Sequence, residues 1–136
     1  MRGRLLSKFP WSIGTYEDTL GISNNKIYVL YNTQLSKIIS YGVMCYCLDE
    51  ADLAKIATLP EERGRGAGGA LLDLMLEDAR KQGAFKTFLE VRESNTAARM
   101  LYASRDFKEI GKRKKYYRNP IEDAVVMVRE EDVSTF

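Results

Sequence analysis

Apolar side chains cluster in three consecutive segments in the first half of the chain. Residues 26–31, 37–48 and 53–59 are rich in β-branched and aromatic side chains, and short polar turns separate them. Such runs favour strands over helices. Because the connections are short, we expect the three strands to pair as antiparallel neighbours. Gly42, inside the second segment, predicts a bulge or a close backbone contact at that point.

The second half of the chain changes to a helical period. Leucine and methionine residues recur three and four positions apart between 70 and 82, which predicts an amphipathic helix. A strand at 86–92 follows, and then a second helix at 96–105 that the Ser94-Asn95 pair opens. The strands at 53–59 and 86–92 flank the first helix, so they should be parallel in a right-handed crossover.

The two ends of the chain carry weaker patterns. A turn at 9–12 predicts a short helix that continues to Leu20. A last strand is expected at 123–128, with 129–136 as a polar tail. Together the elements predict one domain, residues 1–136, with a mixed α/β sheet and flanking helices.

One stretch between the third strand and the first helix stands out by its glycine content. It reads Arg63-Gly64-Arg65-Gly66-Ala67-Gly68-Gly69 and holds four of the ten glycines of the chain. Unpaired backbone N–H groups and the positive end of the dipole make such a helix start an anion site. Glycine lets a phosphate approach closely, and two arginines add charge. No Lys-Ser/Thr pair follows, which argues against a P-loop, but a mononucleotide or a dinucleotide would suit the pattern equally.

Composition narrows the chemistry further. The chain has no histidine, which removes the commonest general base and makes a metal site unexpected. A net charge of +2 is too small to indicate nucleic-acid binding. Cys45 and Cys47 would share one strand face, poorly placed for a disulfide, so we expect buried free thiols in a reducing cytosol rather than a redox or metal pair. No apolar run is long enough to span a membrane and no secretory signal is present, so the expected location is cytoplasmic.

Two further residues are candidates for chemistry. Glu90 interrupts an apolar strand and would share a face with Phe88 and Arg92. A carboxylate at this position is either paired with Arg92 or held for function, and the residues alone do not decide between these. Tyr102 lies in the helix that follows, where it would either pack or present its phenol near the same end of the sheet. Met100, Leu101 and Phe107 would be better core residues.

These pieces, taken in order, resemble one family. The stretch from Arg63 to Gly68 is similar to the [Gln/Arg]-x-x-Gly-x-[Gly/Ala] motif of the GNAT (Gcn5-related) N-acetyltransferases. Residues 89–92, 94–98 and 101–102 resemble those of the ribosomal-protein-alanine N-acetyltransferases of the RimI type. The resemblance extends over most of the chain and implies the GNAT fold, a mostly antiparallel splayed sheet with one parallel β-α-β unit.

The resemblance implies acetyl-CoA as cosubstrate, with no metal. The backbone amides of 64–69 would hold the pyrophosphate, with Arg65 and Arg63 adding charge. The backbone of Ile56-Ala57-Thr58 would bind the pantetheine like an added strand, and Asn95 would lie near it.

The resemblance also implies roles for two side chains in direct transfer from acetyl-CoA to a primary amine. Glu90 would be the general base and Tyr102 the general acid. The acceptor it indicates is the N-terminal alanine amine of a small-subunit ribosomal protein. Other protein termini, lysine, polyamines and small-molecule amines remain open, as does a non-catalytic CoA-binding or ribosome-associated module.

The chain departs from the family pattern in three places. The family opens with a strand and a longer first helix, whereas here only residues 1–8 precede the Phe9-Pro10-Trp11 match, so we expect the first strand to be missing. Asp106 stands where glycine is usual, which suits a positive φ less well. Gly69 is an additional glycine at the start of the helix.

Two charged segments have alternative interpretations. Residues 112–115 are all basic and Tyr116 and Tyr117 follow, which is typical of a nucleic-acid or ribosome surface but also of a solvated strand. We expect no direct nucleic-acid role. The acidic turn at 49–52 would either attract a basic peptide terminus or be a solvated hairpin tip.

Overall fold

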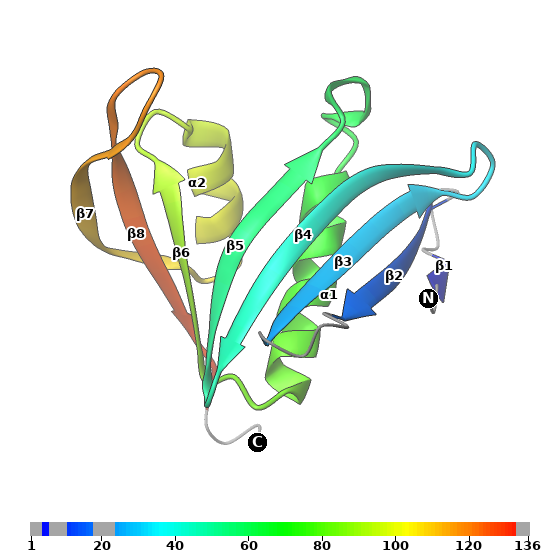
Figure 1. Cartoon of the computed structure of the whole chain (residues 1–136), viewed down its shortest axis with the longest axis horizontal. Coiled ribbons are helices and arrows are strands. Elements are labelled where there is room, and N and C mark those ends of the chain that lie inside the picture. The colour runs from blue at the N-terminus through cyan, green and yellow to red at the C-terminus, as the bar shows by residue number, and fades with distance from the viewer. Residues whose placement is uncertain (1–3, 6–10, 18–23, 133–136) are drawn as a thin grey trace.

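The structure is a computed structural model and describes residues 4–5, 11–17 and 24–132. The described residues form one twisted eight-stranded sheet with the spatial order β1-β2-β3-β4-β5-β6-β8-β7 (Figure 1). The strands are β1 (Arg4–Leu5), β2 (Trp11–Glu17), β3 (Asn25–Asn32), β4 (Lys37–Cys47), β5 (Glu50–Thr58), β6 (Lys86–Arg92), β7 (Lys108–Tyr117) and β8 (Glu122–Glu130). The helices are the short 3₁₀ helix η1 (Pro60–Glu62), α1 (Ala67–Lys81) and α2 (Thr96–Ala103).

The parallel pair that the sequence predicts is β5 and β6, joined through α1. Every other neighbouring pair in the sheet is antiparallel, so the predicted mixed α/β sheet is confirmed. β5 and β6 pair only from Glu50 with Lys86 to Leu53 with Leu89. Beyond that point the two strands diverge, and Figure 1 shows them separating toward the end of β5. We call the point after Leu53 and Leu89 the fork.

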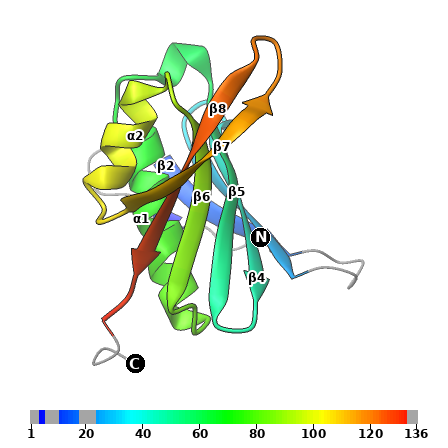
Figure 2. The same cartoon turned by 90° about the vertical axis from the view of Figure 1, so that its left-hand side faces the viewer.

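The core lies between the sheet and the two helices, which cover the same face (Figure 2). Met44, Leu53, Leu89 and Met127 are cross-strand partners in one row, and all four are buried in the core. Because side chains alternate along a strand, the residues next to this row point to the face away from the helices. That second face carries polar side chains such as Asp52 and Glu90, which neighbour Leu53 and Leu89 in their strands.

The N-terminal segment differs from its prediction. Residues 11–17 are not a helix but strand β2, which pairs along its whole length with β3. Cross-strand hydrogen bonds to β3 satisfy this backbone, and that long-range pairing outweighs the weak local helix signal. Two strands, β1 and β2, therefore precede Asn25 in the described part of the chain. Phe9, Pro10 and Leu20 lie outside the described residues.

Several boundaries also move. β5 begins at Glu50, so most of the predicted acidic turn is strand, and β8 extends to Glu130. Gly42 makes the close contact that its position in a strand predicted, because a Cβ there would lie 2.5 Å from the Met75 sulfur, and a register shift follows between Val43 and Met44. No helix in the described part of the chain is long and apolar enough to cross a membrane.

Candidate active site

The glycine-rich stretch forms an open turn that leads into α1. Gly64 and Gly66 have φ values of +82° and +80°, and a Cβ on either would meet nothing within 4 Å. Gly66 is the N-cap of α1 and supplies no side-chain cap. The Ala70 N–H donates to the Gly66 carbonyl oxygen at 3.0 Å, which is the first hydrogen bond of the helix. The N–H groups before Ala70 in the first turn therefore have no intrahelical acceptor. The turn therefore presents backbone donors on an unobstructed surface, as a phosphate group requires.

The two arginines of the turn are held differently. Arg63 donates from Nε to the Thr58 carbonyl oxygen at 3.3 Å, which ties the turn to the end of β5. Arg65 lies 3.6 Å from Glu62 Oε2, and its side chain is mostly exposed. Glu62 is buried, and among the described side chains its Oε2 is the buried polar atom that lacks a hydrogen bond. The sequence reasoning did not identify Glu62, whose charge partly offsets that of Arg65.

The additional glycine has a packing reason. A Cβ on Gly69 would lie 2.8 Å from Nη2 of Arg105, so the missing side chain leaves room for that guanidinium. Arg105 then reaches across to Asp73, with Nε and Nη2 donating to the two carboxylate oxygens at 2.9 and 3.2 Å. This bidentate contact raises the pKa of Arg105. Gly69 therefore fits α1 against the segment that follows α2.

The end of β5 directs backbone groups to its fork side, where the Thr58 carbonyl oxygen already accepts from Arg63 Nε. The Leu59 N–H donates to Ile39 in β4, and alternate residues of a strand hydrogen-bond to opposite sides, so Thr58 and Ile56 direct their backbone groups away from β4. The Ala57 carbonyl oxygen instead accepts from Ser40 Oγ at 2.9 Å, within the sheet. Because β6 has already diverged, an extended ligand has room to add to this edge of β5 at Ile56 and Thr58.

Glu90 is the first residue of β6 beyond the fork. It lines a cavity of about 380 Å³ on the face away from the helices. Its carboxylate is paired not with Arg92 but with Arg113 of β7, whose Nε lies 3.1 Å from Oε1. Arg92 donates instead to the backbone oxygens of Arg118 and Pro120. The structural alternative in which Glu90 pairs with Arg92 is therefore wrong. We call this space the Glu90 cavity; its lining residues are Cys45, Tyr46, Cys47, Glu50, Ala51, Asp52, Phe88, Leu89, Glu90, Arg113 and Val126.

Charges of both signs meet in the Glu90 cavity. Burial and the nearby Glu90 charge raise the pKa of Asp52, while the Arg113 charge acts in the opposite direction. A hydrogen bond with Glu90 raises the pKa of the Tyr116 phenol. Glu50, Asp52 and Glu90 therefore share this space with one guanidinium, an arrangement suited to a cationic ligand. The sequence placed Glu50 and Asp52 in a turn and did not identify Arg113.

The two cysteines also line the Glu90 cavity. Both are free, Cys45 is half-buried and Cys47 is exposed, so the expectation of two buried thiols is wrong for Cys47. Burial raises the pKa of Cys45, which keeps its thiol protonated. Among the described residues, no group of three or more His, Cys, Asp or Glu side chains lies close enough to hold a metal ion.

Tyr102 is the buried residue of α2 and is part of the hydrophobic core. It is 7% exposed, and its ring meets Phe107 edge-on with centroids 5.7 Å apart. Burial, and then the neighbouring Tyr117, raise the pKa of its phenol, so it stays protonated at neutral pH. Tyr102 is absent from the described residues that line the Glu90 cavity. The expectation that Met100, Leu101 and Phe107 are better core residues is confirmed for Phe107, which is 3% exposed, and wrong for Met100, which is 67% exposed.

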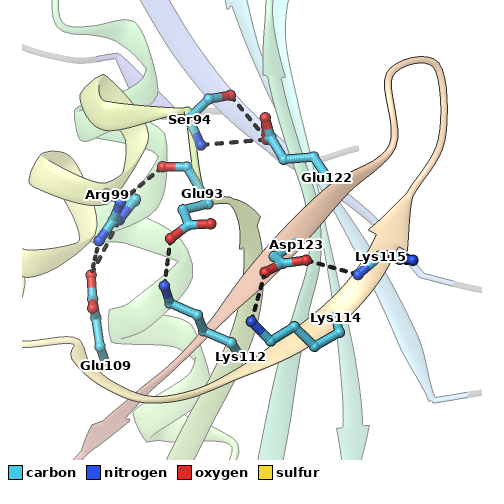
Figure 3. A network of polar contacts seen from close by, with 9 residues as sticks. All are labelled: Glu93, Ser94, Arg99, Glu109, Lys112, Lys114, Lys115, Glu122 and Asp123. Atoms are coloured by element: carbon cyan, nitrogen blue, oxygen red, sulfur yellow. Dashed lines mark hydrogen bonds and ion pairs between the residues drawn. The ribbon is translucent and has the colours of Figure 1, made fainter.

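Asn95 has a clear structural task. It is the N-cap of α2, and its Oδ1 accepts from the Ala98 N–H at 3.1 Å. The β6–α2 connection that contains it is tied to the β7–β8 hairpin (Figure 3). Ser94 contacts Glu122, and Glu93 pairs with Lys112. These contacts fix the start of α2 relative to the last two strands.

The basic run is largely neutralised by these contacts. Lys112 and Lys114 point to Glu93 and Asp123, as Figure 3 shows, and Arg113 points the other way to Glu90. The backbone N–H of Lys115 donates to Asp123 Oδ1 at 2.9 Å. A run whose charges are matched by acids in this way favours the interpretation of a solvated strand over that of a nucleic-acid surface.

Known proteins share both the sequence pattern and the fold. The profile of the acetyltransferase (GNAT) family matches residues 4–107. A [ribosomal protein bS18]-alanine N-acetyltransferase of Haemophilus influenzae is 40% identical over 121 residues, which cover 87% of this chain and 80% of that protein.

Two crystal structures give the same result at the level of the fold. The ribosomal-protein-S18-alanine N-acetyltransferase from Escherichia coli has a TM-score of 0.71 at 36% identity, covering 76% of this chain and 67% of that one. A GNAT family acetyltransferase from Elizabethkingia anophelis with acetyl-CoA bound has a TM-score of 0.72 over 88% of this chain and 98% of that one. At 20% identity, this second likeness concerns the fold alone.

Proposed function

The chain belongs to the GNAT acetyltransferase family, and we propose that it transfers the acetyl group of acetyl-CoA to the N-terminal alanine amine of a small-subunit ribosomal protein. One observation carries the proposal: Glu90 is the first residue beyond the fork, with the free edge of β5 opposite it. A donor bound along β5 and an amine bound beside Glu90 would therefore meet at the fork. The relatives at 36% and 40% identity, whose names specify the alanine of that ribosomal protein, support this acceptor.

The donor side would be recognised mainly by backbone groups. The open amides at the start of α1 suit the pyrophosphate, and Arg63 and Arg65 flank them. The fork-side N–H and carbonyl groups of Ile56 and the N–H of Thr58 suit the amides of the pantetheine arm, and a backbone N–H there would polarise the thioester carbonyl. Asn95 would act through the cap that fixes the start of α2.

The acceptor side would supply the proton transfers. A terminal ammonium must lose a proton before its nitrogen attacks, and Glu90 would accept that proton, through a water molecule. The nitrogen then forms the new amide bond as the carbon–sulfur bond breaks. Tyr102, which burial keeps protonated, is the candidate donor to the departing thiolate. A ribosomal-protein acceptor would place the reaction in the cytoplasm.

The test is release of CoA from acetyl-CoA in the presence of a short peptide that carries the N-terminal sequence of the ribosomal protein, beginning with alanine. The matched control is the same peptide with its terminus already acetylated. We expect turnover with the free peptide only. Turnover of a polyamine or of a lysine side chain instead of the terminus would reject this acceptor. Binding of acetyl-CoA without turnover of any amine would reject the enzyme function in favour of a CoA-binding module.

A further inference from the structure

We propose that the Arg113 guanidinium occupies the position of the acceptor ammonium beside Glu90, in the cavity that Asp52 also lines, and that the acceptor ammonium displaces this guanidinium on binding. The inference rests on the proposed function and specifies how the acceptor is recognised. Arg113 would then be a positioning residue that holds the two carboxylates until the substrate arrives. Asp52 would be a second acceptor-binding carboxylate.

The contacts of Arg113 are those that a bound ammonium would make. Its Nε lies 3.1 Å from Glu90 Oε1. Its positive charge also interacts with the carboxylate of Asp52, which lines the same cavity. Its Cζ lies 5.7 Å from the centroid of the Tyr116 ring, so an aromatic face also borders this cation. A primary ammonium is smaller than a guanidinium and suits the same surroundings.

Arg113 is also free to leave. Its backbone is the last to pair with β8, at Ala124, before the ladder shifts register. Its side chain is 59% exposed, whereas that of Glu90 is 24% exposed. A long exposed side chain on a fixed backbone can swing into solvent without disturbing the sheet. The partly buried carboxylates would then need a new cation, because unpaired buried charge is unfavourable.

The neighbouring basic residues do not share this geometry. Lys112 and Lys114 point to Glu93 and Asp123 (Figure 3), whereas Arg113 pairs with Glu90. Lys114 pairs with Asp123 at 3.5 Å and is 82% exposed. Lys114→Gln is therefore a matched control that removes one positive charge from the same strand, away from the Glu90 cavity.

The experiment measures acceptor binding to Arg113→Gln, Arg113→Lys and Lys114→Gln by calorimetry, with CoA present in place of acetyl-CoA so that no reaction occurs. Because an exposed ion pair contributes little, Arg113→Gln should bind the alanine-terminated peptide about two- to fivefold more tightly. Lys114→Gln should bind it like the wild type, and Arg113→Lys should restore wild-type affinity. Weaker or unchanged binding by Arg113→Gln would overturn the displacement.

Asp52→Asn tests the second carboxylate. Loss of one charged partner of the ammonium should weaken peptide binding about tenfold, with acetyl-CoA affinity unchanged. Asp49→Asn is the matched control, because Asp49 lies in the turn before β5 and is not among the described residues that line the cavity. Equal effects of the two substitutions would remove Asp52 from the acceptor site.

A spectroscopic readout separates displacement from a merely structural role. The Nε–H signal of Arg113, assigned by its absence in Arg113→Lys, should shift when the wild type is saturated with peptide. It should stay in place with the terminally acetylated peptide, which has no ammonium. An unchanged signal in an enzyme that turns over would overturn the displacement alone, whereas absence of CoA release would overturn the proposed function.

Discussion

The two sides of the fork would recognise their proposed ligands by different means. On the donor side, the turn at 63–69 and the edge of β5 present backbone groups. The glycines of the turn leave these groups uncovered, because they have no side chain. On the acceptor side, the Glu90 cavity is defined by charged side chains from β5, β6 and β7. Backbone recognition is insensitive to most substitutions, whereas side-chain recognition changes with single residues. The donor would therefore be common to the family, and the acceptor would be set by residues such as Asp52 and Arg113.

The largest expected effect separates the two sides directly. Glu90→Gln keeps the shape of the side chain but removes its charge, so turnover should fall by about 10²–10⁴-fold. Acetyl-CoA affinity should remain close to that of the wild type, because the donor side does not use this carboxylate. Steady-state kinetics and calorimetry provide the two measurements. Wild-type turnover in Glu90→Gln would exclude Glu90 as the base.

The next effect concerns Tyr102, where packing and catalysis predict different results. Tyr102→Phe keeps the ring contact with Phe107 and removes the hydroxyl, so turnover should fall by about 10²-fold if the phenol donates a proton. The denaturation midpoint of the protein is the internal control and should change little. A stable variant that works at the wild-type rate would leave Tyr102 with a packing role only.

The donor side is tested by a pair of glycines at the two ends of α1. Gly66 and Gly83 have φ values of +80° and +88°, so alanine at either should cost about 1 kcal/mol of unfolding free energy. Only Gly66→Ala places a methyl group on the open turn, where we expect acetyl-CoA affinity to fall about tenfold. If Gly83→Ala weakened acetyl-CoA equally, the effect would come from stability and not from the phosphate site.

The smallest expected effect is at a position that belongs to neither side. Asp106 has a φ of +68°, the left-handed conformation for which the family uses glycine. Asp106→Gly relieves that strain but raises the entropy of the unfolded chain, so the unfolding free energy should change by less than about 0.5 kcal/mol. Urea denaturation measures this, and the KM values for both substrates should stay constant. A change in acceptor KM alone would connect the turn after α2 to the Glu90 cavity.

Local signals in the sequence determined the middle of the fold. The periodicity from 70 to 82, the Asn95 cap and the strand at 86–92 each depend on residues close together in the chain, and all three agree with the structure. The glycine-rich turn was readable for the same reason, because the left-handed backbone at Gly64 and Gly66 favours glycine whatever surrounds it.

Long-range pairing decided the rest. Residues 11–17 form a strand only because β3 offers them an edge, and Glu90 meets Arg113 only because β8 brings β7 alongside β6. Glu50 and Asp52 face the Glu90 cavity because the hairpin after β4 places β5 against β6 in one particular register. A carboxylate and a guanidinium separated by many residues leave no local pattern. The sequence by itself therefore determined the glycine-rich turn, and the tertiary structure decided which charges face the Glu90 cavity.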